Sequence, residues 1–283
     1  MYGLIKLTDL ENLDFPFVYE LSNGIRVVHQ PMKRAIGHCG LMIGCGSRDE
    51  FPAEHGLAHF IEHGLFKGTT KRNNTQVLSR LDSVGGEINA FTAKEETWIH
   101  ASFLHEHTDR AVELIADIAL HSTFDKEEME KEKDVIIDEI NGYKDSPTDM
   151  LFEEMDEMIF PSHPIGRSIL GTEETVKSFK QKDILNFYKR NFVAQNMVFS
   201  YAGPMSKEKL HSILEKHFEG VSKGNSTFNR PDYSAYKKLH LKATKEIHQA
   251  HHGIACRAPH LHQKDRHSFI LLNNILGGPA MNN

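Results

Sequence analysis

The sequence has few cysteines and no long apolar stretch. Its cysteines, Cys39, Cys45 and Cys256, are too few and too scattered for a disulfide framework. Cys39 and Cys45 have the same parity in a predicted strand, which favours buried free thiols and a reducing compartment. No apolar run is long enough to cross a bilayer, and residues 1–15 lack the basic start and apolar centre of a signal peptide. We therefore expect a cytoplasmic protein with no membrane partner.

Basic residues are too few to form a nucleic-acid-binding surface. The chain has 33 Lys and Arg against 39 Asp and Glu, a formal net charge of −6, and the two signs are mixed along the sequence. Nucleic acid is therefore not an expected partner. Apolar residues make up 39% of the 283 residues, which is enough to bury a substantial core. The length predicts one large domain plus part of another.

Histidine is abundant, and one stretch places two histidines around a glutamate. The segment His59–His63 reads HFIEH. His59, Glu62 and His63 share one helical face, so their side chains are expected to face one region. Two neutral imidazoles on one face suit zinc, which needs a third protein ligand. The helix itself is predicted by apolar residues at offsets 0, 3, 4 and 8: Leu57, Phe60, Ile61 and Leu65.

A candidate third ligand lies on a second predicted helix, Asp125–Asp145. Asp125 and Glu128 have the spacing of a capping box at its start. Glu132 and Glu139 lie on one side of this helix, and a solvated acidic face is the usual explanation of such a run. With 19 histidines in the chain, a string of the form H-x-x-E-H arises by chance in roughly one such chain in ten. The residues alone therefore leave both alternatives open.

The order and spacing of these residues resemble the inverzincin peptidases of family M16. In that family the third metal ligand is a glutamate about 76 residues after the second histidine, with another glutamate about seven residues before it. Here Glu139 follows His63 by 76 residues and Glu132 by 7. The resemblance extends from about residue 21 to the last residue. It is also carried by four shorter segments: Gly46–Glu50 (GSRDE), His63–Thr69 (HGLFKGT), Gly85–Thr92 (GGEINAFT) and Leu276–Gly278 (LGG).

The resemblance implies a zinc-dependent endopeptidase that hydrolyses peptides or unfolded polypeptides. His59, His63 and Glu139 would hold a single zinc ion per chain. Glu62 would be the catalytic base that accepts a proton from water, and Glu132 would orient a ligand or share in proton handling. Relatives often carry a larger apolar residue in place of Gly64, and this departure is expected to loosen the helix slightly.

The resemblance also implies a substrate-binding strand at a sheet edge beside the metal, at Glu87–Ala93. An extended peptide would pair with it through main-chain hydrogen bonds. Asn89 and Ala90 would hold the substrate backbone, and Phe66 would line the pocket just beyond the cut. The alternative is that these are ordinary edge and core residues. Relatives supply an arginine and a tyrosine from a second half, so this chain alone is expected to bind metal but hydrolyse peptides poorly.

The predicted elements indicate an α+β fold, an antiparallel sheet with helices packed on one side. Residues 1–220 are expected to form the catalytic zinc-binding domain, 221–234 a linker, and 235–283 the truncated beginning of a second, similar domain. Strand character recurs near Leu239 and over residues 246–256. Asn23 and Gly24 predict a hairpin turn. We expect strands at residues 17–21, 25–29, 36–45, 87–92, 97–104 and 196–202, and further helices at 74–84, 108–121, 149–159, 183–191 and 206–218.

Two other functions fit parts of the pattern. The first is a non-catalytic partner subunit or peptide-binding scaffold of the same fold, against which the intact set of metal residues argues. The second is a metal-dependent lyase of small thioethers, whose third ligand is a cysteine; Cys256 lies too far along the chain to fit it. A homodimer, or pairing with a similar subunit, is expected. The histidines between residues 248 and 267 share no helix or strand face, and we interpret them as surface positions.

Overall fold

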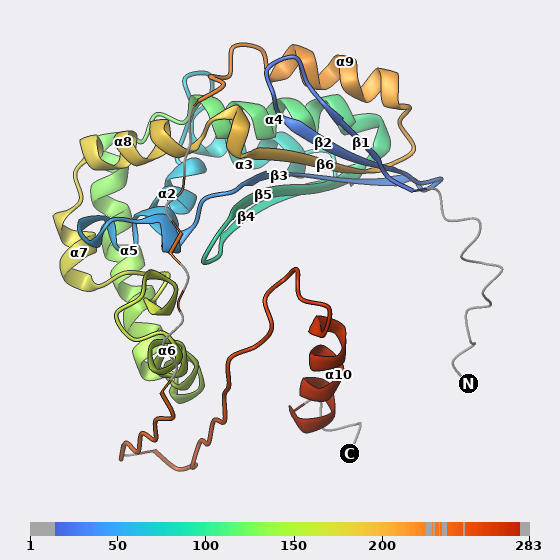
Figure 1. The fold of residues 1–283 in the computed structure, drawn as a ribbon. Helices are drawn as coiled ribbons and strands as arrows, with labels where there is room; N and C mark the ends of the chain where they lie inside the picture. Colours follow the sequence, from blue (N-terminus) through green and yellow to red (C-terminus); the bar gives the residue numbers. More distant parts are fainter. Residues whose placement is uncertain are drawn as a thin grey trace.

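The computed structural model describes residues 15–224, 228, 230, 231, 233, 237–245 and 247–277. Their main body is a six-stranded sheet with the strand order β1-β2-β6-β3-β5-β4 (Figure 1). Residues 1–14, which bear on the signal-peptide expectation, and Gly278 of the LGG segment lie outside the described residues. The strands are β1 (Phe17–Glu20), β2 (Arg26–Pro31), β3 (Ile36–Ile43), β4 (Glu87–Thr92), β5 (Thr97–Leu104) and β6 (Met197–Gly203).

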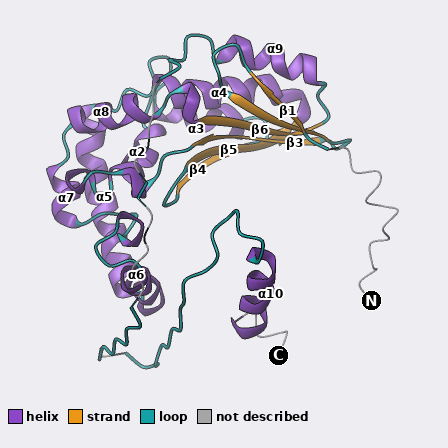
Figure 2. Cartoon of the chain, viewed as in Figure 1, coloured by secondary structure: helices purple, strands orange, loops and turns teal. Residues whose placement is uncertain are grey.

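Helices cover one face of the sheet. Helices α3, α4 and α9 lie along this face, whereas α5 and α6 extend from one end of it (Figures 1 and 2). Within the described part of the chain, no helix packs on the opposite face. The α-helices are α2 (Leu57–Leu65), α3 (Asn74–Asp82), α4 (Thr108–His121), α5 (Lys126–Asp145), α6 (Pro147–Ile159), α7 (Glu173–Ser178), α8 (Gln181–Asn191), α9 (Lys207–His217) and α10 (Arg266–Gly277).

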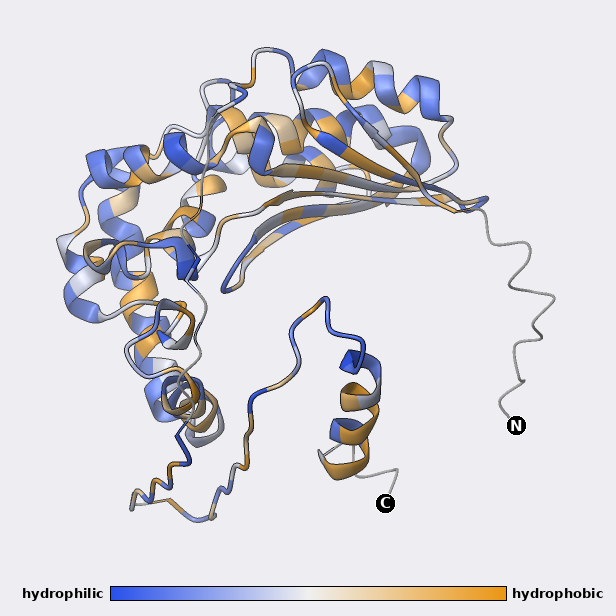
Figure 3. Ribbon diagram, viewed as in Figure 1, coloured by the Kyte–Doolittle hydropathy of each residue, from blue (hydrophilic) through white to orange (hydrophobic). Residues whose placement is uncertain are grey.

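The core lies between the sheet and these helices. Along β5 and β6, fully buried residues alternate with half-buried ones, because successive side chains of a strand point to opposite faces. The buried set of β5 includes Ile99, Ala101 and Phe103, and α4 packs on β3 and β5. The helices carry apolar stripes on their otherwise polar surfaces (Figure 3). The predicted α+β fold is confirmed, and Cys39 and Cys45 are buried free thiols as expected.

The sheet differs from the expectation at one pair of strands. β2 pairs with β6 in parallel, with Val27 opposite Phe199, whereas the other pairs are antiparallel. Seven α-helices lie between β2 and β6 in the chain, and strands so far apart in sequence are free to pair in parallel. The first hairpin is as predicted: Gly24 has φ +98°, a conformation that glycine adopts without strain.

The region after residue 236 is not the sheet that the sequence indicated. Described residues from 237 to 256 form no strand and are exposed, so the strand expectation near Leu239 and over 246–256 is wrong for them. A strand forms only where a neighbour satisfies its main-chain groups, and within the described residues this segment lies beside helix α6 rather than beside another strand. Helix α10 follows, with no buried residue. None of the helices in the described residues is both long and apolar enough to cross a membrane.

Candidate metal centre

The first two candidate ligands lie on the short helix α2. Leu57, Phe60 and Ile61 are buried against the core, as the periodicity predicted. His59 and His63 lie one turn apart on the neighbouring face, and their ring centroids are 4.6 Å apart. Gly64 faces the start of α5: a Cβ atom there would lie 2.7 Å from the ring of Phe124. The small residue therefore allows close packing of α2 and α5.

The third candidate lies on helix α5. Asp125 is the N-cap of this helix, and its Oδ1 accepts hydrogen bonds from the amides of Glu127 and Glu128. Two turns separate Glu132 from Glu139 on the side that faces α2, because seven residues are close to two full turns. Glu132 is buried, and Glu139 is about one-third exposed.

Three side chains converge on one point. Oε2 of Glu139 lies 3.5 Å from Nε2 of His59 and 3.5 Å from Nε2 of His63. Neighbouring ligand atoms around a tetrahedral zinc ion, each about 2.0–2.1 Å from the metal, are roughly 3.4 Å apart. The donor set and its spacing therefore fit zinc. The ligand atoms of these three side chains all lie within 4.8 Å of one another, close enough to hold a metal ion. Among the histidine, cysteine and acidic side chains of the described residues, this is the group that meets that condition.

Glu132 contacts the other side of His63. Its Oε1 lies 2.8 Å from Nδ1 of His63, and its Oε2 lies 2.5 Å from Nζ of Lys67. A hydrogen bond at Nδ1 leaves Nε2 directed toward Glu139 and sets the orientation of the ring. Lys67 was not predicted from the sequence as a site residue, although it follows His63 by one helical turn, a spacing that brings side chains together.

The electrostatics of the two imidazoles differ. Burial lowers the pKa of His59 to about 4, and the neighbouring His63 adds to this effect while Glu139 opposes it. Burial would also lower the pKa of His63, but its hydrogen bonds to Glu132 and Glu139 outweigh burial and raise it to about 9. Without metal, His63 is therefore the ring that carries an additional proton, and His59 is neutral. A metal ion would take the place of that proton, since a metal-binding imidazole is neutral.

Glu62 lies between the two histidines on the same helix. Burial raises the pKa of its carboxyl group, while Thr92 and the charge of His63 act in the opposite direction. A carboxylate with a raised pKa accepts a proton more readily than an exposed glutamate does. Thr92 belongs to β4, and its Oγ1 donates a hydrogen bond to the carbonyl of Ala58 on α2. The predicted edge strand therefore lies directly beside the metal helix.

The three predicted substrate-binding residues lie near this junction. β4 is the last strand of the sheet order, so its outer edge is free of other strands in the described part of the chain. Asn89 is exposed, and its Oδ1 accepts a hydrogen bond from the amide of Ala90. Ala90 is buried, and Phe66 is half-buried at the C-cap of α2. Their roles in substrate binding stay predictions.

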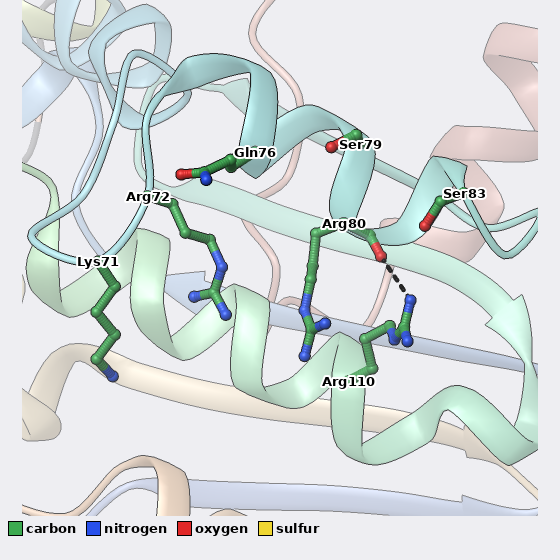
Figure 4. Close-up of a pocket in the computed structure, with 7 residues that line it drawn as sticks. All are labelled: Lys71, Arg72, Gln76, Ser79, Arg80, Ser83 and Arg110. Atoms are coloured by element: carbon green, nitrogen blue, oxygen red, sulfur yellow. Dashed lines mark hydrogen bonds between the residues drawn. The ribbon is translucent and has the colours of Figure 1, made fainter.

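A second group of charged side chains connects α3 and the loop before it to α4. A hollow of about 410 Å³ between α3 and α4 is lined by four cationic side chains among others (Figure 4). Arg72 pairs with Asp117 and Glu113 of α4, and Arg80 lies 3.4 Å from Glu113. Arg110 donates a hydrogen bond to the carbonyl of Arg80. These contacts attach α3 and the loop before it to α4.

Comparisons with known proteins point to one family. A family model described as Insulinase (Peptidase family M16) matches residues 26–173, and one described as Peptidase M16 inactive domain matches residues 178–282. An uncharacterized zinc protease of Bacillus subtilis, YmxG, is 36% identical over 264 residues, which are 92% of this chain and 63% of that protein. An uncharacterized zinc protease of Rickettsia bellii is 35% identical over 234 residues, or 82% of this chain and 56% of that protein.

Solved structures share the fold. A protease from Helicobacter pylori matches with a TM-score of 0.71 and 24% identity, over 77% of this chain and 52% of that one. A peptidase M16 inactive domain from Pseudomonas fluorescens matches with a TM-score of 0.73 and 16% identity, over 78% and 54%. The chain spans less than two thirds of the length of these relatives. The family models and the sequence relatives show that the chain belongs to the insulinase family, peptidase family M16.

Proposed function

We propose that this chain carries the catalytic centre of a zinc-dependent endopeptidase that hydrolyses peptides or unfolded polypeptides. The observation that carries the proposal is the convergence of His59, His63 and Glu139, whose ligand atoms lie within 4.8 Å of one another. These three side chains would hold a single zinc ion. A bound zinc ion would supply Lewis-acid polarisation of the scissile carbonyl and would make a water molecule a better nucleophile.

The protein residues around this centre would handle protons and orientation. Glu62 would accept a proton from the attacking water on its carboxylate and deliver it to the amine nitrogen released when the peptide bond breaks. Glu132 would hold the ring of His63 through Nδ1, at the observed 2.8 Å. The positions of the two side chains beside His59 and His63 support both proposed roles.

The substrate would bind as an added strand on β4. The free edge of this strand offers main-chain hydrogen bonds to any extended sequence, and Asn89 and Ala90 lie in its centre. Phe66 would line the pocket beyond the cut. An unfolded segment satisfies this mode best, because a folded substrate has already paired its main-chain groups.

The first domain is proposed to extend over residues 1–220, since β6 and α9 complete the sheet and its helical layer. Residues 221–234 would be the linker to a second, similar domain. The chain spans 63% of YmxG and 56% of the Rickettsia bellii protein. We therefore infer that it works with a second half, supplied by a longer form, a second copy or a similar subunit. Alone it would hydrolyse peptides slowly.

The proposal is tested by zinc analysis together with digestion of an unfolded peptide, with Glu139→Ala as the comparison. The parent chain should bind zinc near one equivalent and cleave the peptide, whereas the variant should lose most of both. Zinc bound equally well without Glu139 would overturn the assigned ligand set. A thioether lyase with a cysteine ligand would then become the better hypothesis.

A non-catalytic partner subunit is the second candidate. It is favoured by a further relative, subunit 1 of the cytochrome b-c1 complex of Bos taurus, which is 28% identical over 92% of this chain and 55% of that protein. The retained metal residues argue against this alternative. Zinc binding without hydrolysis, by this chain and by any longer form that contains it, would support it.

A further inference from the structure

The metal helix α2 begins without a capping side chain of its own. Its N-cap residue is Gly56, which has φ +93° and no side chain to accept a hydrogen bond. The first N–H groups of any helix lack partners within the helix. His59 is the third residue of α2 and therefore belongs to this first turn. The cap of α2 thus bears directly on a metal ligand.

A capping side chain at position 56 is excluded by packing. A Cβ atom there would lie 2.6 Å from the carbonyl oxygen of Leu170 and 2.8 Å from Cα of Gly171. Both contacts are with main-chain atoms, which cannot rotate away. The positive φ angle also disfavours any residue with a side chain. The partner of the free amides must therefore come from another part of the chain.

Glu50 supplies that partner from the loop before the helix. Its Oε2 accepts a hydrogen bond from the amide of Gly56 at 2.9 Å, and its Oε1 accepts one from the amide of Ala58 at 2.8 Å. The residue is only 4% exposed, so water does not replace these bonds. Ala58 immediately precedes His59. One buried carboxyl group therefore holds the main chain directly before the first proposed metal ligand.

The loop that carries Glu50 is itself held in place. Nη2 of Arg167 donates a hydrogen bond to the main-chain carbonyl of Glu50 at 3.0 Å. The preceding residue, Asp49, accepts two hydrogen bonds from Arg230, each 2.8 Å long. Two arginines from later parts of the sequence thus fix the loop. The position of the Glu50 carboxyl group is therefore determined by tertiary contacts as well as by the loop itself.

We propose that Glu50 is a positioning residue of the metal centre: it caps α2 from outside the helix and thereby holds His59 in line with Glu139. The expected effect on zinc binding rests on the proposed function, whereas the hydrogen bonds that cap α2 are observed independently of it. A helix of nine residues has little stability of its own. Loss of its cap should loosen the first turn, which carries His59, more than the last turn, which carries His63.

The test compares Glu50→Ala and Glu50→Gln with the parent chain. Glu50→Ala removes both acceptors, whereas the isosteric Glu50→Gln keeps one oxygen and replaces the other by an amide donor. We expect zinc affinity, measured by chelator competition, to fall about tenfold or more for Glu50→Ala, as is typical when a group that orients a metal ligand is removed. Glu50→Gln should lie in between. The visible absorption spectrum of the cobalt(II)-substituted protein should change in the same order.

The matched control is Ser206→Ala, which removes the N-cap of another helix, α9, where Oγ of Ser206 accepts a hydrogen bond from the amide of Lys209. Its melting temperature should fall while zinc affinity and the cobalt spectrum stay at parent values. Hydrogen exchange in the metal-free proteins should be faster at Ala58 in the Glu50 variants alone.

The outcomes separate the two proposals. Failure of the parent chain to bind zinc would remove the proposed function, while faster exchange at Ala58 would still support the cap. If the parent binds zinc and Glu50→Gln folds with unchanged affinity, spectrum and exchange, Glu50 has no positioning role. If Glu50→Ala fails to fold, the decision rests on Glu50→Gln.

Discussion

Glu132 contacts His63 on the side opposite Glu139, with Oε1 of the carboxylate 2.8 Å from Nδ1 of the ring. Lys67 holds the other oxygen of the same carboxylate. Burial would raise the pKa of Glu132, but the hydrogen bonds from His63 and Lys67 outweigh it and lower the pKa. The carboxylate therefore stays charged and fixes which nitrogen of His63 faces Glu139.

Replacing Glu132 should weaken metal binding without removing a ligand. In Glu132→Gln the neutral amide is a weaker acceptor for His63 and no longer pairs with Lys67. We expect zinc affinity to fall about 10–100-fold, the usual cost of losing such a partner. Chelator competition measures this. Glu130→Gln is the control, because Glu130 lies on the same helix but pairs with Lys133 at the surface. Equal affinities of the two variants would exclude the orienting role.

Replacing Glu62 should separate metal binding from catalysis. Glu62→Gln keeps the size of the side chain but cannot accept a proton from water. Zinc content should stay near that of the parent, while the rate of peptide cleavage should fall by a factor of about 10²–10⁴, the typical contribution of a general base. Zinc analysis and digestion of an unfolded peptide are measured on the same sample. Retained turnover would remove Glu62 from this role.

A side chain at position 56 should destabilise the protein. Gly56→Ala would place a residue with a Cβ atom at φ +93°, 2.6 Å from the oxygen of Leu170. The left-handed conformation alone costs about 1–2 kcal/mol, and the overlap adds to it. The free energy of unfolding from a denaturant titration should fall by more than about 1 kcal/mol.

The control for this variant is Gly142→Ala. Gly142 lies within α5, and a Cβ atom there would meet nothing within 4 Å. Alanine is favoured over glycine inside a helix by about 0.5–1 kcal/mol, so this variant should be more stable than the parent. A destabilisation of the same size in both variants would show that the tight contact at Gly56 is not the cause.

The buried carboxyl of Glu50 should make stability depend on pH. Burial raises its pKa from 4.5 to about 8, while the amides of Ala58 and Gly56 and the charge of Arg167 oppose the rise and Glu54 adds to it. The folded state therefore binds more protons than the unfolded state between these values, so this contribution to stability is present at low pH and is lost as the pH rises toward 8.

The measurement is the free energy of unfolding of the metal-free protein between pH 5 and pH 8. The parent chain should lose stability over this range relative to Glu50→Gln, whose amide does not titrate. Parallel curves for the two proteins would show that Glu50 has an ordinary pKa in the folded state.

The periodicity of the sequence was sufficient to predict the helices that carry the proposed ligands. The apolar stripe of α2 and the Asp125 cap of α5 depend only on residues that are close together in the sequence, so the sequence alone predicts them. The intervals of 7 and 76 residues identified Glu132 and Glu139 through their resemblance to a family. Periodicity alone favoured an acidic, solvated face as the usual explanation for these two residues.

Periodicity misled where a partner was needed. Residues 246–256 have strand character, yet those described form no strand, because main-chain groups of a strand need a neighbouring strand. The parallel pairing of β2 with β6 was also not foreseen. Strand order depends on which arrangement buries the most apolar surface area. The total buried area depends on the whole chain, so a local pattern cannot give it.

The sequence by itself determined the helix that carries His59 and His63, the spacing to Glu139 and the family. Tertiary structure alone decided that Glu50 caps this helix and that Lys67 shares Glu132 with His63. A hint existed in the sequence, since no Ser, Thr, Asp or Asn lies immediately before Leu57. It showed that a cap was missing but not which residue supplied it, because hydrogen bonds between distant segments form only after packing has brought them together.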